Sequence, residues 1–182
     1  MSEMFSRRVF LRGLGVVAAA AALTACSSTN EAVNQALIEG AVGGIVAADC
    51  KIGRMTYWAA NATVPVYEIS FRIVMTNVSS KPVTLSGDNF ATTLDGTPIP
   101  PFNFSARDVG DADIWRTYDS LTIRPGEERS VALEYEINQS TYDSWYRSSR
   151  TVAVSFTCGN QRVTYTKNSR SDEITVSDIE TL

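Results

Sequence analysis

Apolar and polar residues alternate with a period of two through most of the chain after residue 45. The alternation is clearest over residues 67–76, where mainly polar residues separate Tyr67, Ile69, Phe71, Ile73 and Met75. A period of two puts successive side chains on opposite faces of a β-strand, so one face of this strand is expected to be buried. The pattern predicts further strands at 45–52, 83–85, 90–94, 121–123, 131–137, 151–158 and 162–166.

Turn-forming residues separate the predicted strands. Asp95-Gly96 is a strong hairpin signal, and other turns are marked by Pro82, Pro125-Gly126 and Gly159-Asn160. Short strands with turns every 8–12 residues are typical of an antiparallel sandwich. We therefore predict an all-β, antiparallel β-sandwich of about seven strands over residues 45–167, followed by a polar, frayed tail over 168–182.

The first 25 residues have the layout of a targeting segment and lie outside the predicted fold. Arg7, Arg8 and Arg12 precede a Gly/Ala-rich apolar run over residues 13–22, and small residues stand just before Cys26. The run is shorter than the roughly 20 residues that a transmembrane helix needs. A buried N-terminal helix is the other alternative, and the paired arginines argue against it.

Two motifs in this leader resemble bacterial signals. Ser6-Arg7-Arg8-Val9-Phe10-Leu11-Arg12 resembles a twin-arginine export signal with Arg12 in place of the usual Lys, and Leu23-Thr24-Ala25-Cys26 resembles a lipobox. The resemblance implies export, cleavage of residues 1–25 and a lipid on the Cys26 thiol. Residues 26–44 are then expected to form a lipidated N-terminus and tether at the outer face of the cell membrane.

The absence of histidine narrows the chemistry of the chain. It excludes Ser-His-Asp and Cys-His nucleophile systems and His-based zinc or copper sites. The formal net charge of −4 argues against nucleic-acid binding and against electrostatic attachment to anionic lipid. We therefore expect no cofactor, no nucleic-acid partner, and membrane association through acyl chains.

Cys50 and Cys158 remain once Cys26 is assigned to the anchor. The alternation predicts that Cys50 shares one strand face with Val46, Ala48 and Ile52. An even pair of cysteines in an oxidising compartment favours a disulfide between Cys50 and Cys158. Two reduced core cysteines, or a lone reactive thiol, are the alternatives.

Two short segments carry a family resemblance. Residues 71–83 look like the strand-and-turn signature of immunoglobulin-like domains in bacterial lipoproteins of unknown function, and Leu121-Thr122-Ile123-Arg124-Pro125-Gly126-Glu127 resembles their second hallmark. The resemblance implies an immunoglobulin-like sandwich and a surface location. It transfers no catalytic residue.

Carboxylates form two candidate sites, each with a simpler alternative. Asp108, Asp111 and Asp113 could bind a hard cation such as calcium, but they lack the EF-hand order, and a solvated acidic loop is the preferred interpretation. Glu134 and Glu136 stand two apart on a predicted strand and resemble a paired acid and base, but ordinary polar alternation is the preferred interpretation there.

Aromatic residues and arginines gather on the irregular segments. Such loops have the composition of protein interfaces, but aromatic residues also cap the ends of sandwich cores. The aromatic residues are Phe102, Phe104, Trp115, Tyr118, Trp145 and Tyr146, beside Arg107, Arg116 and Arg147.

The combined pattern predicts a lipid-anchored, extracytoplasmic binding module without catalytic activity. Its expected partner is an envelope protein or cell-surface ligand. Two alternatives remain: a structural or envelope-assembly lipoprotein, and an enzyme that uses carboxylates on a carbohydrate.

Overall fold

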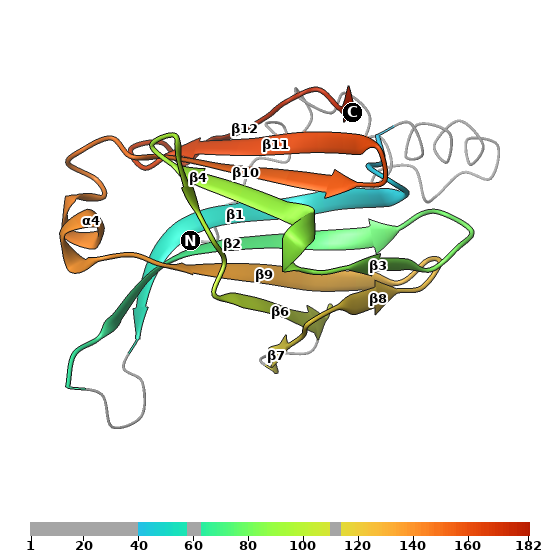
Figure 1. Cartoon of the computed structure of the whole chain (residues 1–182), viewed down its shortest axis with the longest axis horizontal. Helices are drawn as coiled ribbons and strands as arrows, with labels where there is room; N and C mark the ends of the chain where they lie inside the picture. Colours follow the sequence, from blue (N-terminus) through green and yellow to red (C-terminus); the bar gives the residue numbers. More distant parts are fainter. Residues whose placement is uncertain (1–39, 58–62, 110–113) are drawn as a thin grey trace, which may run out of the picture.

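Two antiparallel sheets pack against each other in the computed structural model, which describes residues 40–57, 63–109 and 114–182 (Figure 1). The first sheet has the order β1 (Ile45–Tyr57), β2 (Val66–Asn77), β9 (Glu128–Glu136), β6 (Asn103–Asp108) and β7 (Arg116–Thr117). The second has the order β12 (Ile174–Val176), β11 (Gln161–Asn168), β10 (Thr151–Cys158), β4 (Phe90–Leu94) and β5 (Thr97–Ile99), and β13 (Glu180–Thr181) pairs with β11. A further pair joins β3 (Val83–Leu85) to β8 (Leu121–Ile123).

The strand order identifies the architecture. In a constant-type immunoglobulin domain, strands A, B, E and D form one sheet and strands C, F and G form the other. The orders β1-β2-β9-β6 and β4-β10-β11 match this arrangement when the seven strands are lettered along the chain. The predicted immunoglobulin-like β-sandwich of about seven strands is therefore confirmed. Its short helical segments are η1 (Gly87–Asn89) and α4 (Gln139–Ser144).

The core lies between the inner faces of the two sheets. β2 contributes Ile69, Phe71, Ile73 and Met75, each no more than 1% exposed. The Phe71 ring centroid lies 6.2 Å from that of Phe90 and 5.7 Å from that of Tyr165, both in the second sheet. Full burial of an apolar side chain of this size stabilises the fold by roughly 1.5–3 kcal/mol. The alternation predicted for residues 67–76 thus forms the centre of the core.

One buried hydrogen bond also joins the sheets. Thr92 Oγ1 of β4 donates to the Tyr135 hydroxyl oxygen of β9 at 2.6 Å. Burial raises the pKa of Tyr135 to about 12, although the bond from Thr92 acts in the opposite direction. The phenol therefore stays neutral at physiological pH, and no charge is buried between the sheets at this point.

β1 is an edge strand whose pattern differs from the predicted one. Ala48 pairs with Val74 but Lys51 pairs with Arg72, so β1 contains one extra residue, at a bulge where Asp49 has φ 49°. An extra residue at a bulge changes whether odd-numbered or even-numbered residues of the strand face the core. The core-facing residues are therefore Ile45 and Ala47 before the bulge and Ile52 after it, and Cys50 at the bulge also packs against the core. The predicted core face is thus wrong for Val46 and Ala48 and correct for Cys50 and Ile52. Lys167 Nζ donates to the Ile52 carbonyl oxygen at 2.9 Å.

Both ends of the described domain are more ordered than predicted. Ala41 and Val42 are buried at 5% and 3% exposure, so the packed domain begins within the predicted tether. The predicted frayed tail is also wrong, because β12 and β13 both pair with β11. The apolar side chains Ile174, Val176 and Ile179 pack against the core and hold this segment in place.

Cys50 and Cys158 are free thiols, so the predicted disulfide is not formed. Cys158 lies opposite Gln161 at the start of β11. Cys50 lies beside Tyr165 and Lys167, which follow later on the same strand. Four residues of strand span roughly 13 Å, whereas bridged Cα atoms lie within about 7 Å. Burial raises the pKa of both thiols, which makes them poor nucleophiles.

The Asn77 side chain is fully buried at the end of β2 and joins two turns. Its Nδ2 donates to the carbonyl oxygens of Lys81 and Ile123, each at 2.8 Å. Its Oδ1 accepts from Ser79 N at 2.9 Å and from Ser79 Oγ at 2.8 Å. The backbone of Asn77 also exchanges hydrogen bonds with the 126–127 turn. The two segments that carry the family resemblance therefore meet at this residue.

We predict that Asn77→Ala lowers the free energy of unfolding by about 3 kcal/mol, because a buried polar group left without its partner costs about 1–3 kcal/mol. Urea unfolding of the purified protein measures the change. Asn160→Ala is the matched control, since Asn160 is exposed in the β10–β11 turn. Equal midpoints for the two variants would contradict the prediction.

A second prediction concerns the thiols. The Cys26→Ser protein, denatured without reductant, should react with two equivalents of a thiol reagent, because Cys50 and Cys158 are both free. Reductant should leave its melting temperature unchanged. A bridge would instead give no reactive thiol, and it would close a loop of about 100 residues that is worth roughly 4.7 kcal/mol in the chain-entropy account.

Candidate interaction site

α4 stands at one end of the sandwich, where the chain passes from β9 to β10 (Figure 1). The Asn138 side chain begins the helix by accepting from Thr141 N at 2.8 Å. A helix of only six residues needs tertiary packing to persist. Here the Tyr142 ring packs on that of Tyr67 at 4.9 Å between centroids, and the Trp145 side chain enters the core at 2% exposure.

Arginine and serine side chains hold carbonyl oxygens of α4 and of the turn that follows it. Ser169 Oγ donates to the Trp145 carbonyl oxygen, and Arg54 Nη1 donates to that of Tyr142 at 2.7 Å. Arg170 donates to the carbonyl oxygens of Tyr146 and Arg147. Carbonyls at a helix C-terminus lack partners within the helix and favour nearby cations. These bonds fix the turn after α4 to β1 and to the segment after β11.

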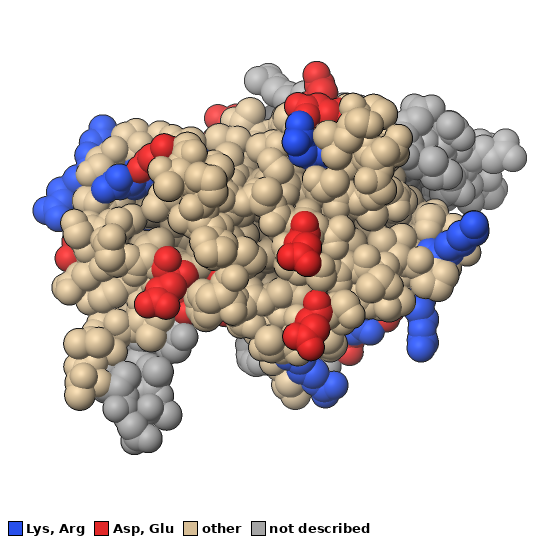
Figure 2. Space-filling model, in the orientation of Figure 1, with Lys and Arg blue, Asp and Glu red and all other residues tan. Residues whose placement is uncertain are grey.

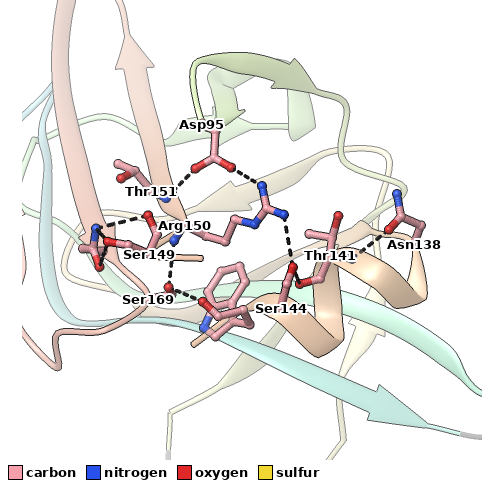
Figure 3. A network of polar contacts seen from close by, with 10 residues as sticks. Asp95, Asn138, Thr141, Ser144, Ser149, Arg150, Thr151 and Ser169 are labelled. Carbon is pink, nitrogen blue, oxygen red and sulfur yellow. Dashed lines mark hydrogen bonds and ion pairs between the residues drawn. The ribbon is translucent and has the colours of Figure 1, made fainter. Parts of the chain in front are cut away.

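The Asp95–Arg150 ion pair ties this turn to the second sheet (Figure 3). Arg150 Nη1 lies 2.7 Å from Asp95 Oδ2, and Arg150 Nη2 donates to Ser144 Oγ at 3.1 Å. Slight burial acts to raise the pKa of Asp95, but hydrogen bonds from Thr151 N and Arg150, with the arginine charge, outweigh it and lower that pKa. Asp95 therefore remains ionised and paired at neutral pH.

Tyr146 extends from this support into solvent. The Arg54 guanidinium carbon lies 4.2 Å from the Tyr142 ring centroid and 4.8 Å from that of Tyr146. The Tyr146 side chain nevertheless remains 58% exposed. Stacking on a fixed arginine orders an exposed aromatic ring before any partner arrives. Lys and Arg side chains are visible at this end of the molecule in Figure 2.

Trp115 belongs to a separate cluster on the outer face of the first sheet. Its ring lies 5.4 Å from the Arg72 guanidinium and 5.0 Å from that of Arg107. Arg72 and Tyr67 are an odd number of residues apart on β2, so their side chains lie on opposite faces of the strand. Tyr67 is the residue that packs on Tyr142 of α4. The structure therefore does not bring Trp115 together with the aromatic residues of α4.

The other predicted aromatic residues divide between core and surface. Phe104 and Trp145 are buried at 6% and 2% exposure, so for them the core interpretation is correct. Tyr118 is partly buried and packs against the core. Phe102 is 49% exposed, which leaves Phe102 and Tyr146 as the strongly exposed members of the set.

The acidic candidates form no metal centre among the described residues. No group of three or more His, Cys, Asp or Glu side chains in that part of the chain could hold a metal ion. Asp108 pairs with Arg129, whereas Asp111 and Asp113 lie outside the described residues. Glu134 Oε2 accepts from Asn103 Nδ2 at 2.6 Å, and Glu136 is exposed.

The leader residues Arg7, Arg8 and Cys26 also lie outside the described ranges. Within those ranges, no helix combines the length and the apolar character needed to cross a bilayer. Sequence reasoning did not identify the roles of Arg54 and Arg150. Arg54 bonds to Tyr142, 88 residues away in the sequence, and Arg150 bonds to Asp95, 55 residues away. A local sequence pattern therefore does not indicate either role.

No protein-family model matches the chain, and no curated protein matches it. Among solved structures, the chain is similar to an uncharacterized β-sandwich protein from Clostridium difficile, with 15% identity, coverage of 68% of this chain and 83% of that one, and a TM-score of 0.41. It is also similar to the yjhA protein of Bacillus subtilis, with 16% identity, coverage of 62% and 73%, and a TM-score of 0.38. Similarity at this level identifies no shared site.

The Arg54 stack gives a testable prediction. Arg54→Ala should lower the free energy of unfolding by about 1–2 kcal/mol, because it removes a hydrogen bond to a carbonyl and two cation–π contacts. Chemical denaturation measures this loss. Arg162→Ala is the control, since its exposed pair with Glu180 should contribute less than about 1 kcal/mol. An Arg54→Ala protein as stable as the control would contradict the role assigned to the stack.

Proposed function

We propose that this protein is an exported lipoprotein, anchored through Cys26 to the outer face of the cell membrane, whose β-sandwich binds another macromolecule. Export through the twin-arginine route and lipidation are supported by the motifs at Arg7-Arg8 and Leu23–Cys26. A diacylated N-terminus anchors a protein stably, whereas a single chain does so only marginally.

The position of the first packed residues supports a short tether. Ala41 and Val42 are already buried, so only residues 27–40 separate Cys26 from the folded domain. A domain joined this closely to its anchor is held near the membrane surface. The sandwich would then act on components of the cell envelope.

One observation carries the binding assignment: Tyr146 is 58% exposed although its ring is stacked on Arg54 and its backbone is bonded by Arg170. A rigid, exposed tyrosine loses little conformational entropy on binding and offers both apolar area and a hydroxyl. The adjoining turn holds Ser148, Ser149 and Arg147, residue types that are common in binding loops.

We expect Cys26→Ser to move the protein from the membrane fraction to the soluble fraction, because the thiol is the proposed lipid attachment point. Fractionation after labelling with a radioactive fatty acid measures both location and lipid. The Arg7→Lys, Arg8→Lys variant keeps Cys26 and should remain unprocessed inside the cell, which separates export from lipidation. Label on the Cys26→Ser protein would overturn the proposed anchor.

A further inference from the structure

The tether enters the sandwich at the end opposite to α4. Gly43 N donates to Gln161 Oε1 at 2.9 Å, and a Cβ on Gly43 would lie 2.4 Å from Cys158 Sγ, so the entering chain is pressed against the β10–β11 turn. Leu182 N donates to the Asn160 carbonyl in the same turn at 2.8 Å. Both ends of the described domain therefore lie beside this turn (Figure 1).

β10 and β11 connect the two ends of the domain. Thr151 and Asn168 pair at the α4 end, and Cys158 and Gln161 pair at the tether end. Eight residues of strand span roughly 26 Å. If the tether end faces the bilayer, the turn after α4 faces away from it.

The turn after α4 also contains a residue in an unfavourable backbone conformation. Ser149 has φ 51°, in the left-handed region that is costly for residues other than glycine. The bonds of Arg150 N to Ser169 Oγ at 2.9 Å and of Ser149 Oγ to Asn168 Oδ1 at 3.2 Å hold it there. Strained residues that are held in place cluster at functional sites, which is a second indication that this turn is used.

The charges around Tyr146 indicate the chemistry of a partner. The Arg147 and Arg170 side chains flank it, both residues are exposed, and neither forms an ion pair within the described ranges. Arg150 is paired with Asp95, so it adds no unpaired charge beside Tyr146. The exposed acidic residues nearest in the sequence are Asp143, one turn of helix before Arg147, and Asp172 and Glu173, which follow Arg170. Tyrosine and arginine are the residue types that most often dominate binding energy at protein interfaces.

We propose that the turn formed by Tyr146, Arg147 and Ser148, together with Arg170, is the partner-binding surface, that it faces away from the membrane, and that it binds a protein surface bearing carboxylates. This inference rests on the proposed function, since the lipid anchor defines which end faces the membrane. Tyr146 supplies the apolar contact and Arg147 pairs with the partner's carboxylates, while Arg170, whose Nε and Nη2 donate to the Tyr146 and Arg147 carbonyl oxygens, supports the turn and adds positive charge beside it.

The surface is tested by site-specific photocrosslinking in the full-length protein in native membranes. A photoreactive residue at Ser148 should give a discrete adduct, and one at Asn160 should not. Arg147→Glu should reduce the Ser148 adduct at least tenfold, and Asp143→Lys should increase it. Arg124→Glu is the matched control, because Arg124 is also exposed and forms no ion pair within the described ranges.

The orientation is tested with the lipidated protein in phosphatidylcholine vesicles that contain a nitroxide-labelled lipid. A fluorophore at Asn160 should be quenched more strongly than one at Ser148. Equal quenching, a Ser148 adduct that survives Arg147→Glu, or no adduct at Ser148 would overturn the inference. Loss of the anchor is detected separately: if wild type and Cys26→Ser fractionate alike, the proposed function fails whatever the adducts show.

Discussion

The buried amide of Asn77 is the interaction on which the arrangement of the chain depends. Two carbonyl oxygens and two donor groups of neighbouring turns meet at one side chain without access to water. Because β2 ends here, the amide fixes where the chain leaves for β3 and where it returns from β8 into β9. Those connections place β9 beside β2 in the first sheet, and β9 carries the chain onward to α4. The candidate surface is therefore built on a backbone whose path is set at the opposite end of the sandwich.

Strands with one buried face were predictable, because their pattern depends on local parity alone. β10 alternates as expected, with Phe156 fully buried, and β2 does so from Phe71 onward, whereas Glu68 and Ser70 on its opposite face are buried as well. The bulge in β1 was not predictable, since its extra residue becomes visible only against the register of β2. The C-terminal strands contain too few apolar residues to show a period. The disulfide was predicted from the strand face expected for Cys50 and from the oxidising compartment. A bond also requires the two cysteines to lie close together. They do not, because they lie beside different positions along β11.

The candidate surface was predictable in composition but not in geometry. Aromatic residues on irregular segments were correctly marked as either interface or core, and burial divided them: Trp145 anchors the turn from inside, and Tyr146 projects from it. Neighbouring residues in the sequence thus have opposite roles. The arginines that order this turn come from β1 and from the segment after β11. Such long-range support leaves no trace in a local pattern, so only the folded chain reveals which tyrosine is held rigid.

β1 is an edge strand of the first sheet, and its geometry bears on whether copies of the protein associate through this edge. A long edge strand presents unpaired backbone groups to which another copy could add. The bulge at Asp49 interrupts the regular hydrogen-bonding edge, and the Lys167 ammonium donates a hydrogen bond to the Ile52 carbonyl oxygen. Within the described residues, this edge therefore offers another copy no continuous template for sheet extension.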